Sequence, residues 1–65
     1  MKDAFGTELF EGDIVVQYRY RMGNTLRRIM SIENGVARLC PVRNITASTV
    51  SGSNLAKYFD QTVEV

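Results

Sequence analysis

The sequence has no histidine and no tryptophan, and it contains only one cysteine and one proline. Without histidine, the chain cannot form a Ser-His-Asp triad, a Cys-His pair or a zinc site with histidine ligands. A single cysteine excludes a disulfide scaffold within the chain, and no run approaches the roughly 18 apolar residues of a membrane-spanning helix. We therefore expect no catalytic residues, no metal site, no cofactor and no insertion into a membrane.

What the sequence does contain suits one small domain, residues 1–65, with 45% apolar residues and a net charge of +1. Disordered chains are more charged and less apolar than this. A core of this size rarely supplies more than about 3–5 kcal/mol of net stability, and it leaves little material for the supported cleft that catalysis needs. The length therefore favours a compact binding module, not an enzyme.

The N-terminal residues are charged, with Lys2, Asp3, Glu8 and Glu11 among a few apolar ones, so we expect no secretory signal in them. The lone Cys40 fits a reducing compartment, in which a thiol behaves as a small apolar side chain. We expect a soluble protein of the cytoplasm.

Residues 14–21 alternate with a period of two and are rich in β-branched and aromatic side chains, which predicts a strand. The alternation separates two faces, one with Ile14, Val16, Tyr18 and Tyr20, the other with Val15, Gln17, Arg19 and Arg21. We predict that the first face is buried and that its tyrosines close the core. Gly23 and Asn24 favour a chain reversal, after which the next strand begins near Thr25.

The apolar residues of segment 26–32 change their spacing part of the way along it. A β-bulge near Arg28 or Met30 would explain this change, because one extra residue shifts the parity of all that follow. A short helix is the alternative, although seven residues would make a marginal one. Asn34-Gly35 then predicts a two-residue type I′ hairpin turn leading into a strand over residues 36–39.

The remaining chain predicts two more strands, at residues 45–50 and 61–65, with a single helical or 3-10 turn at residues 55–59. Five short strands joined by tight turns favour an all-β fold, a small five-stranded antiparallel barrel in which closure removes exposed edges. The predicted core is Phe5, Leu9, Ile14, Val16, Tyr18, Ile29, Ile32, Leu39, Cys40 and Val63.

Gly12-Asp13-Ile14-Val15-Val16, followed by Ile29-x-x-Ile32 and Asn34-Gly35-Val36, resembles small SH3-like barrels of the KOW type. In particular, Asp3-Ala4-Phe5-Gly6 leading into Gly12-Asp13-Ile14-Val15 is similar to the opening of short, mostly uncharacterised bacteriophage proteins. The resemblance covers about residues 3–39. It implies an SH3-like barrel and a viral accessory protein that acts in the cytoplasm of a host cell.

Charge is unevenly distributed along the chain. Residues 14–43 carry a net charge of +5, whereas residues 1–13 carry −3 and residues 44–65 carry −1. All the cations of the central segment are arginines, which suit bidentate contacts to phosphate or carboxylate. The candidate partner-binding residues are Arg19, Arg21, Arg27, Arg28, Arg38 and Arg43. Pairing through the turn near Gly23 is expected to bring Arg27 or Arg28 beside Arg19 and Arg21.

Three roles for these arginines remain open. In the first, they form a patch for the acidic surface of a host protein that handles nucleic acid or serves in defence, and we rank this role first because a net charge of +1 attracts DNA weakly. In the second they bind nucleic acid directly, and in the third they only solvate an exposed sheet face. A structural role is a further alternative, in which an edge strand such as residues 45–50 pairs in a homo-oligomer.

The acidic residues Glu8, Glu11 and Asp13 lack the Asp-x-Asp-x-Asp-Gly spacing of a calcium loop. Asp13, which follows Gly12, is instead expected to accept backbone hydrogen bonds in the turn before the first strand.

Overall fold

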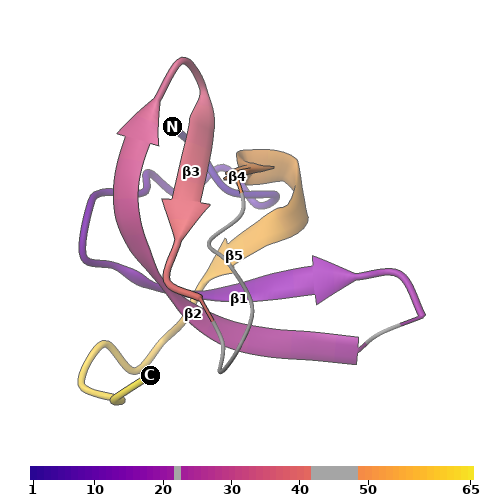
Figure 1. The fold of residues 1–65 in the computed structure, drawn as a ribbon, viewed down its shortest axis with the longest axis vertical. Coiled ribbons are helices and arrows are strands. Elements are labelled where there is room, and N and C mark those ends of the chain that lie inside the picture. The colour runs from indigo at the N-terminus through magenta and orange to yellow at the C-terminus, as the bar shows by residue number, and fades with distance from the viewer. Residues whose placement is uncertain (22, 42–48) are drawn as a thin grey trace.

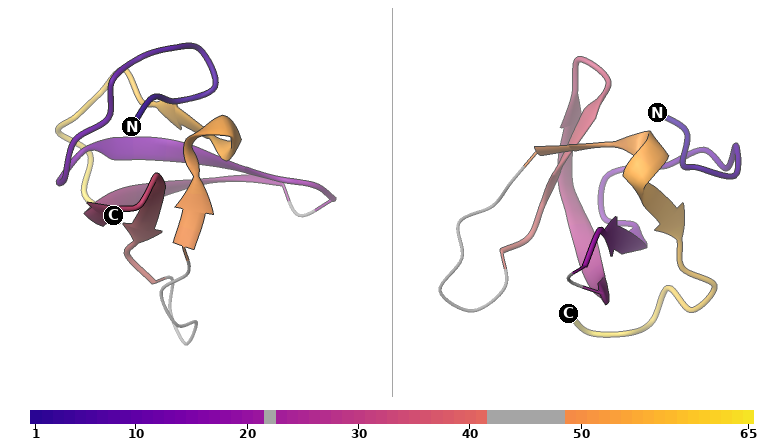
Figure 2. Two further views of the ribbon diagram at one scale, coloured as in Figure 1. Left: turned by 90° about the horizontal axis from the view of Figure 1, so that it is seen from above. Right: turned by 90° about the vertical axis from the view of Figure 1, so that its right-hand side faces the viewer.

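The computed structural model describes residues 1–21, 23–41 and 49–65. The strands are β1 (Ile14–Arg19), β2 (Gly23–Glu33), β3 (Val36–Leu39), β4 (Thr49–Ser51) and β5 (Leu55–Lys57), and the 3-10 turn η1 (Gly52–Asn54) precedes β5. They form an antiparallel sheet in the order β4-β3-β2-β1-β5, which curls into a half-barrel (Figures 1 and 2). The prediction of an all-β, five-stranded antiparallel barrel with a short 3-10 turn before the last strand is confirmed.

The long strand β2 organises this sheet, because each of its halves pairs with a different neighbour (Figure 1). The first half pairs with β1, from Arg19 opposite Gly23 to Ile14 opposite Arg28. The second half pairs with β3, and its register shifts between Ile29 and Ser31. The shift is the predicted bulge, located at Met30, and it lets the sheet bend between the two pairings.

The turn between β2 and β3 is the predicted hairpin. Asn34 and Gly35 have φ angles of 52° and 77°, and Glu33 lies opposite Val36. Positive φ at both central residues is what a type I′ turn requires. The reversal before β2 also has positive φ, at Arg21 and Gly23, and β2 starts at Gly23, two residues earlier than predicted.

The C-terminal third differs from the prediction in position. The 3-10 turn occupies Gly52–Asn54 instead of residues 55–59, and the last strand is Leu55–Lys57 instead of residues 61–65. Leu55 is fully buried where β5 pairs with β1, so tertiary packing overrides the helical character of this segment. Of the strand predicted at residues 45–50, residues 45–48 lie outside the described residues, and β4 begins at Thr49.

The core is small and aliphatic, and it lies on the concave face of the half-barrel. Its buried members are Leu9, Val15, Ile29, Ala37, Leu39 and Leu55, and Met1, Ile32 and Val50 pack against them. Ile14 is also fully buried, on the opposite face of β1. Its backbone is held there by Gln61, which donates to its carbonyl and accepts from its N–H group.

The predicted core was therefore right for Leu9, Ile14, Ile29 and Leu39, but wrong in the orientation of β1. Val15 and Gln17 are buried, whereas Tyr18 and Tyr20 are exposed and Val16 is only half-buried. Cys40 and Val63 are half-buried, and Phe5 is exposed in the N-terminal loop. Alternation identifies two faces, but the register against β5, which places Leu55 opposite Gln17, decides which one is buried.

The N-terminal loop is fastened to the sheet by Asp3. Its buried carboxylate accepts hydrogen bonds from the backbone N–H groups of Phe5, Thr7 and Lys57 at 2.8–2.9 Å. Nearby, a Cβ atom at Gly52 would collide with the carbonyl oxygen of Lys2, so only glycine fits there. Among the described residues, no helix is long and apolar enough to cross a membrane.

Candidate functional site

Tyrosine and arginine side chains lie together at the tip of the β1–β2 hairpin, where both tyrosines and Arg21 are exposed and Arg19 is half-buried. We call Tyr18, Arg19, Tyr20 and Arg21 the Tyr-Arg tip. Strand β5 pairs only with Val15–Gln17, so it does not extend alongside these residues. Tyr20 is 87% exposed, and the guanidinium carbon of Arg21 lies 5.4 Å from the centre of its ring. The tip thus presents an aromatic surface beside a cation.

Arg27 and Arg28, the two candidate arginines of β2, do not lie in the Tyr-Arg tip, because the register of the hairpin places them away from it. Arg19 lies opposite Gly23, whereas Arg27 lies opposite Val15 and Arg28 opposite Ile14. Four residues of strand separate the two ends, which is about 13 Å at about 3.3 Å per residue. The expectation that Arg27 or Arg28 would lie beside Arg19 and Arg21 is wrong, because the reversal comes two residues earlier in the chain than predicted, which shifts the register of the hairpin.

Arg28 is engaged within the protein. Its Nη1 donates to the carbonyl oxygen of Gly12 at 3.0 Å, and its Nη2 donates to that of Val63 at 3.5 Å. It therefore ties the turn before β1 and the C-terminal segment to β2. This half-buried side chain is a poor candidate for a partner contact, because binding would have to break both hydrogen bonds.

Arg27 is buried, with only 3% of its surface exposed. Its Nη1 donates to the carbonyl oxygen of Cys40 at 3.0 Å, while its Nε has no hydrogen-bond partner. The cross-strand pair beside it, Gln17 and Thr25, also holds buried side-chain oxygens without partners. The inner surface of the half-barrel is therefore polar at the end nearest the Tyr-Arg tip.

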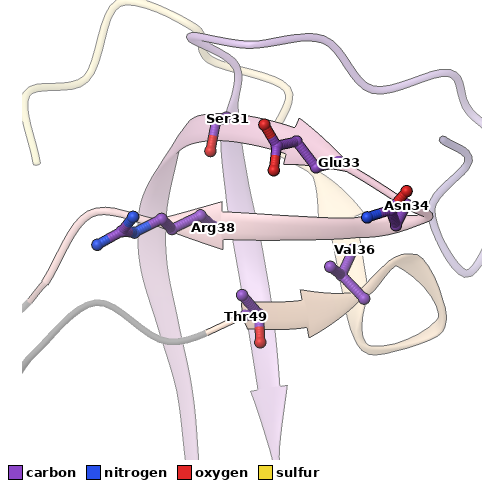
Figure 3. Close-up of a pocket in the computed structure, with 6 residues that line it drawn as sticks. All are labelled: Ser31, Glu33, Asn34, Val36, Arg38 and Thr49. Carbon is purple, nitrogen blue, oxygen red and sulfur yellow. The ribbon is translucent and has the colours of Figure 1, made fainter.

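Arg38 lies on another surface, on the convex side of the second half of the sheet. It is exposed on β3, opposite Ser31 of β2 and Thr49 of β4. These residues line a shallow hollow of about 260 Å³ together with Glu33, Asn34 and Val36. Figure 3 shows the Arg38 side chain extending away from Glu33. The last predicted residue, Arg43, lies outside the described residues.

Several carboxylates form hydrogen bonds or ion pairs within the protein. Asp13 accepts a hydrogen bond from the Phe10 N–H group at 2.9 Å, as predicted for the turn, and it pairs with Lys57 at 3.3 Å. Glu8 pairs with the N-terminal ammonium group at 3.0 Å, a hydrogen bond that lowers its pKa. Burial alone would raise the pKa of Asp3, but backbone N–H groups, first that of Lys57, hold it below its ordinary value.

Sequence reasoning missed two features of this surface. It placed Tyr18 and Tyr20 in the core, and it did not expect Arg27 to be buried. The burial of Gln17 indicates that the tyrosine face of β1 is the exposed one. This burial follows only from the position of β5 at Leu55–Lys57, which places Leu55 opposite Gln17. The burial of Arg27 has no local signal, because it depends on where Cys40 crosses beside β2.

The described residues contain no group of three or more His, Cys, Asp or Glu side chains that could hold a metal ion. Comparison of the chain with protein-family models, with curated proteins and with solved structures found no match.

Proposed function

We propose that this protein is a non-enzymatic binding module whose Tyr-Arg tip binds an acidic surface of another protein. The observation that carries the proposal is the exposure of Tyr18 and Tyr20, which alternate with Arg19 and Arg21 along the chain. Tyrosine and arginine are the residue types enriched at binding hot spots, because they bury a large area and make polar contacts together. A hairpin held by β1–β2 pairing presents them at a low ordering cost.

The partner is expected to be acidic, because the cations of the tip, exposed Arg21 and half-buried Arg19, have no counter-ion among the described residues. The ion pairs among the described residues use Met1 and Lys57 as cations, not Arg19 or Arg21. The resemblance to short bacteriophage proteins suggests where to search for it. Under this proposal the partner is a host protein that handles nucleic acid or serves in defence.

Nucleic acid is the second candidate, and the exposed ring of Tyr20 favours it, since bases stack on such rings. The electrostatic contribution would be small, because Arg27 and Arg28 are engaged internally. With Arg19, Arg21 and Arg38 contributing, the log–log salt slope on single-stranded DNA would be about −2 or shallower.

The experiment is affinity capture from bacterial lysate, before and after nuclease treatment, with the intact protein and two variants as bait. The Tyr20→Ala/Arg21→Ala variant removes the tip, and Arg38→Ala removes an exposed arginine elsewhere. A protein partner predicts that one acidic protein is captured by the intact protein and by Arg38→Ala, survives nuclease, and is lost with the tip variant.

Other outcomes would support the alternative functions, nucleic-acid binding or a structural role. Capture that disappears with nuclease, together with a salt slope near −2, would assign the tip to nucleic acid. Equal capture by all three baits would reject the tip. A stable homo-oligomer, measured by light scattering, that captures nothing would support the structural role, in which an edge strand such as β4 pairs between copies.

A further inference from the structure

The shallow hollow on the convex side of the second half of the sheet is not part of the Tyr-Arg tip (Figure 3). Three neighbouring strands build it in register, because Arg38 of β3 lies opposite both Ser31 of β2 and Thr49 of β4. One cross-strand pair further along, Glu33 lies opposite Val36. These residues alternate along their strands with residues of the core, so a paired sheet holds them in place.

The hollow has one exposed charge of each sign, Glu33 and Arg38, and neither takes part in the ion pairs found among the described residues. They occupy diagonal positions of the β2–β3 pairing, at which residues of neighbouring strands are about 7–8 Å apart. The Arg38 side chain extends away from Glu33 (Figure 3). The two charges therefore lie at opposite ends of the hollow. Drawing them together would gain little, because exposed ion pairs contribute little to stability.

The rest of the lining suits a chain of methylene groups between two polar ends. Val36 is half-buried and contributes an apolar surface beside Glu33. The two hydroxyl residues opposite Arg38 add hydrogen-bond donors at its end, and Asn34 of the hairpin turn adds an amide at the other. At about 260 Å³ the hollow is smaller than the roughly 300 Å³ at which drug-sized sites begin. The ligand is therefore a small molecule or one residue of a peptide.

We propose that this hollow binds a small zwitterion whose carboxylate and ammonium groups are joined by a short methylene chain. Arg38 binds the carboxylate, since guanidinium and carboxylate form strong, often bidentate hydrogen bonds. Glu33 accepts hydrogen bonds from the ammonium group, and the methylene chain lies on Val36. Free ω-amino acids and the C-terminal lysine of a peptide both carry this arrangement of charges.

This site is separate from the proposed function of the Tyr-Arg tip. Arg38 lies on β3, which pairs with the second half of β2, whereas the tip lies beyond the opposite end of β2, where the first half pairs with β1. Loss of the tip, by Tyr20→Ala/Arg21→Ala, is expected to leave zwitterion binding unchanged, so the two proposals can fail independently.

The test is a titration of the ¹⁵N-labelled protein with 6-aminohexanoate, followed by NMR at the backbone amides and at the Arg38 Nε–H signal. We expect saturable shifts at Ser31, Glu33, Val36 and Arg38, with the millimolar affinity of so small a ligand. Hexanoate and hexylamine each lack one of the two charges and should bind at least about threefold more weakly. Glycine, whose charges lie too close together to reach both ends, should also bind more weakly. Absence of saturable shifts, or equal affinity for hexanoate, for hexylamine or for glycine, would overturn the proposal.

Two conservative variants assign the two ends of the ligand. In Arg38→Met, 6-aminohexanoate should bind no better than hexylamine binds the intact protein, and in Glu33→Gln no better than hexanoate does. Both positions are exposed, so both variants are expected to fold. Arg21→Met, which removes an exposed arginine of the tip, is the matched control and should keep the affinity of the intact protein. Unchanged affinity in either hollow variant, or an equal loss in the control, would contradict the proposal.

A further ligand distinguishes a free amino acid from a protein terminus. Nα-acetyl-lysine has a free carboxylate and a free side-chain ammonium group, as a lysine at the C-terminus of a protein does. It is compared with 6-aminohexanoate and with its own amide. Tighter binding of acetyl-lysine than of 6-aminohexanoate indicates a protein terminus, and tighter binding of 6-aminohexanoate indicates a free ω-amino acid. Binding of the amide as tight as that of the acid would refute recognition of the carboxylate.

Discussion

The two halves of β2 belong to regions of opposite character. The second half packs Ile29 and Ile32 against Ala37, Leu39 and Val50, and a tight hairpin turn closes it. The first half pairs with β1, faces inward with Thr25 and Arg27, and ends at the exposed Tyr-Arg tip. One strand therefore connects a region in which its own buried side chains are aliphatic to a region in which its inward side chains are polar and which ends at the exposed tip. The bulge at Met30 lies between the two regions.

The comparison predicts that changes in the aliphatic region cost stability first. Leu39→Ala removes a fully buried side chain opposite Ile29, and such truncations cost about 2–5 kcal/mol, which is enough to unfold a domain of this size. Leu26→Ala is the matched control, because Leu26 lies in the first half of β2 and is 36% exposed. Thermal unfolding followed by circular dichroism checks both. A folded Leu39→Ala protein with an unchanged melting temperature would contradict this division.

The next largest effect is expected at Asp3, which holds the N-terminal loop to β5 through Lys57. Asp3→Ala leaves several backbone N–H groups without their charged acceptor, at a cost of about 1–3 kcal/mol. Glu11→Ala, an exposed carboxylate of the same segment, is the control and should be nearly neutral.

The same residue predicts a pH dependence. Because folding lowers the pKa of Asp3, its contribution is complete above the unfolded value of about 3.9. It is lost as the pH falls from there through the lower folded pKa. Stability measured by urea unfolding should thus decline below about pH 4 in the intact protein, and less steeply in Asp3→Asn. Parallel curves for the two proteins would argue against this assignment.

A smaller effect is expected at the hairpin turn of the aliphatic region. Gly35 has a φ of 77°, and a β-branched residue is strained there. Gly35→Val should cost about 1–2 kcal/mol, while Asn34→Gly, which keeps the required backbone conformation, should be tolerated. The two melting temperatures provide the comparison, and equal values would refute the type I′ turn.

Local signals in the sequence were sufficient where a short segment determines its own structure. The Asn34-Gly35 turn, the bulge and the aliphatic residues Leu9, Ile29 and Leu39 could all be predicted in this way. The burial of Val15 instead of Tyr18 could not be predicted in this way. It depends on pairing with the last strand, β5, which is only three residues long and shows no periodicity of its own. The positions of the arginines relative to one another could not be predicted either, since a reversal two residues earlier than expected separates Arg19 from Arg27.

The smallest effect on stability, and the largest on binding, is expected at the Tyr-Arg tip. Tyr20 is exposed, so Tyr20→Ala should change the free energy of unfolding by no more than about 0.5 kcal/mol.

The most direct test of the account measures the melting temperature of the Tyr20→Ala/Arg21→Ala protein together with its affinity for the captured partner. The account predicts an unchanged melting temperature and a loss of affinity of at least about tenfold, because hot-spot residues carry most of the binding energy. A large fall in melting temperature, or an affinity equal to that of the intact protein, would contradict it.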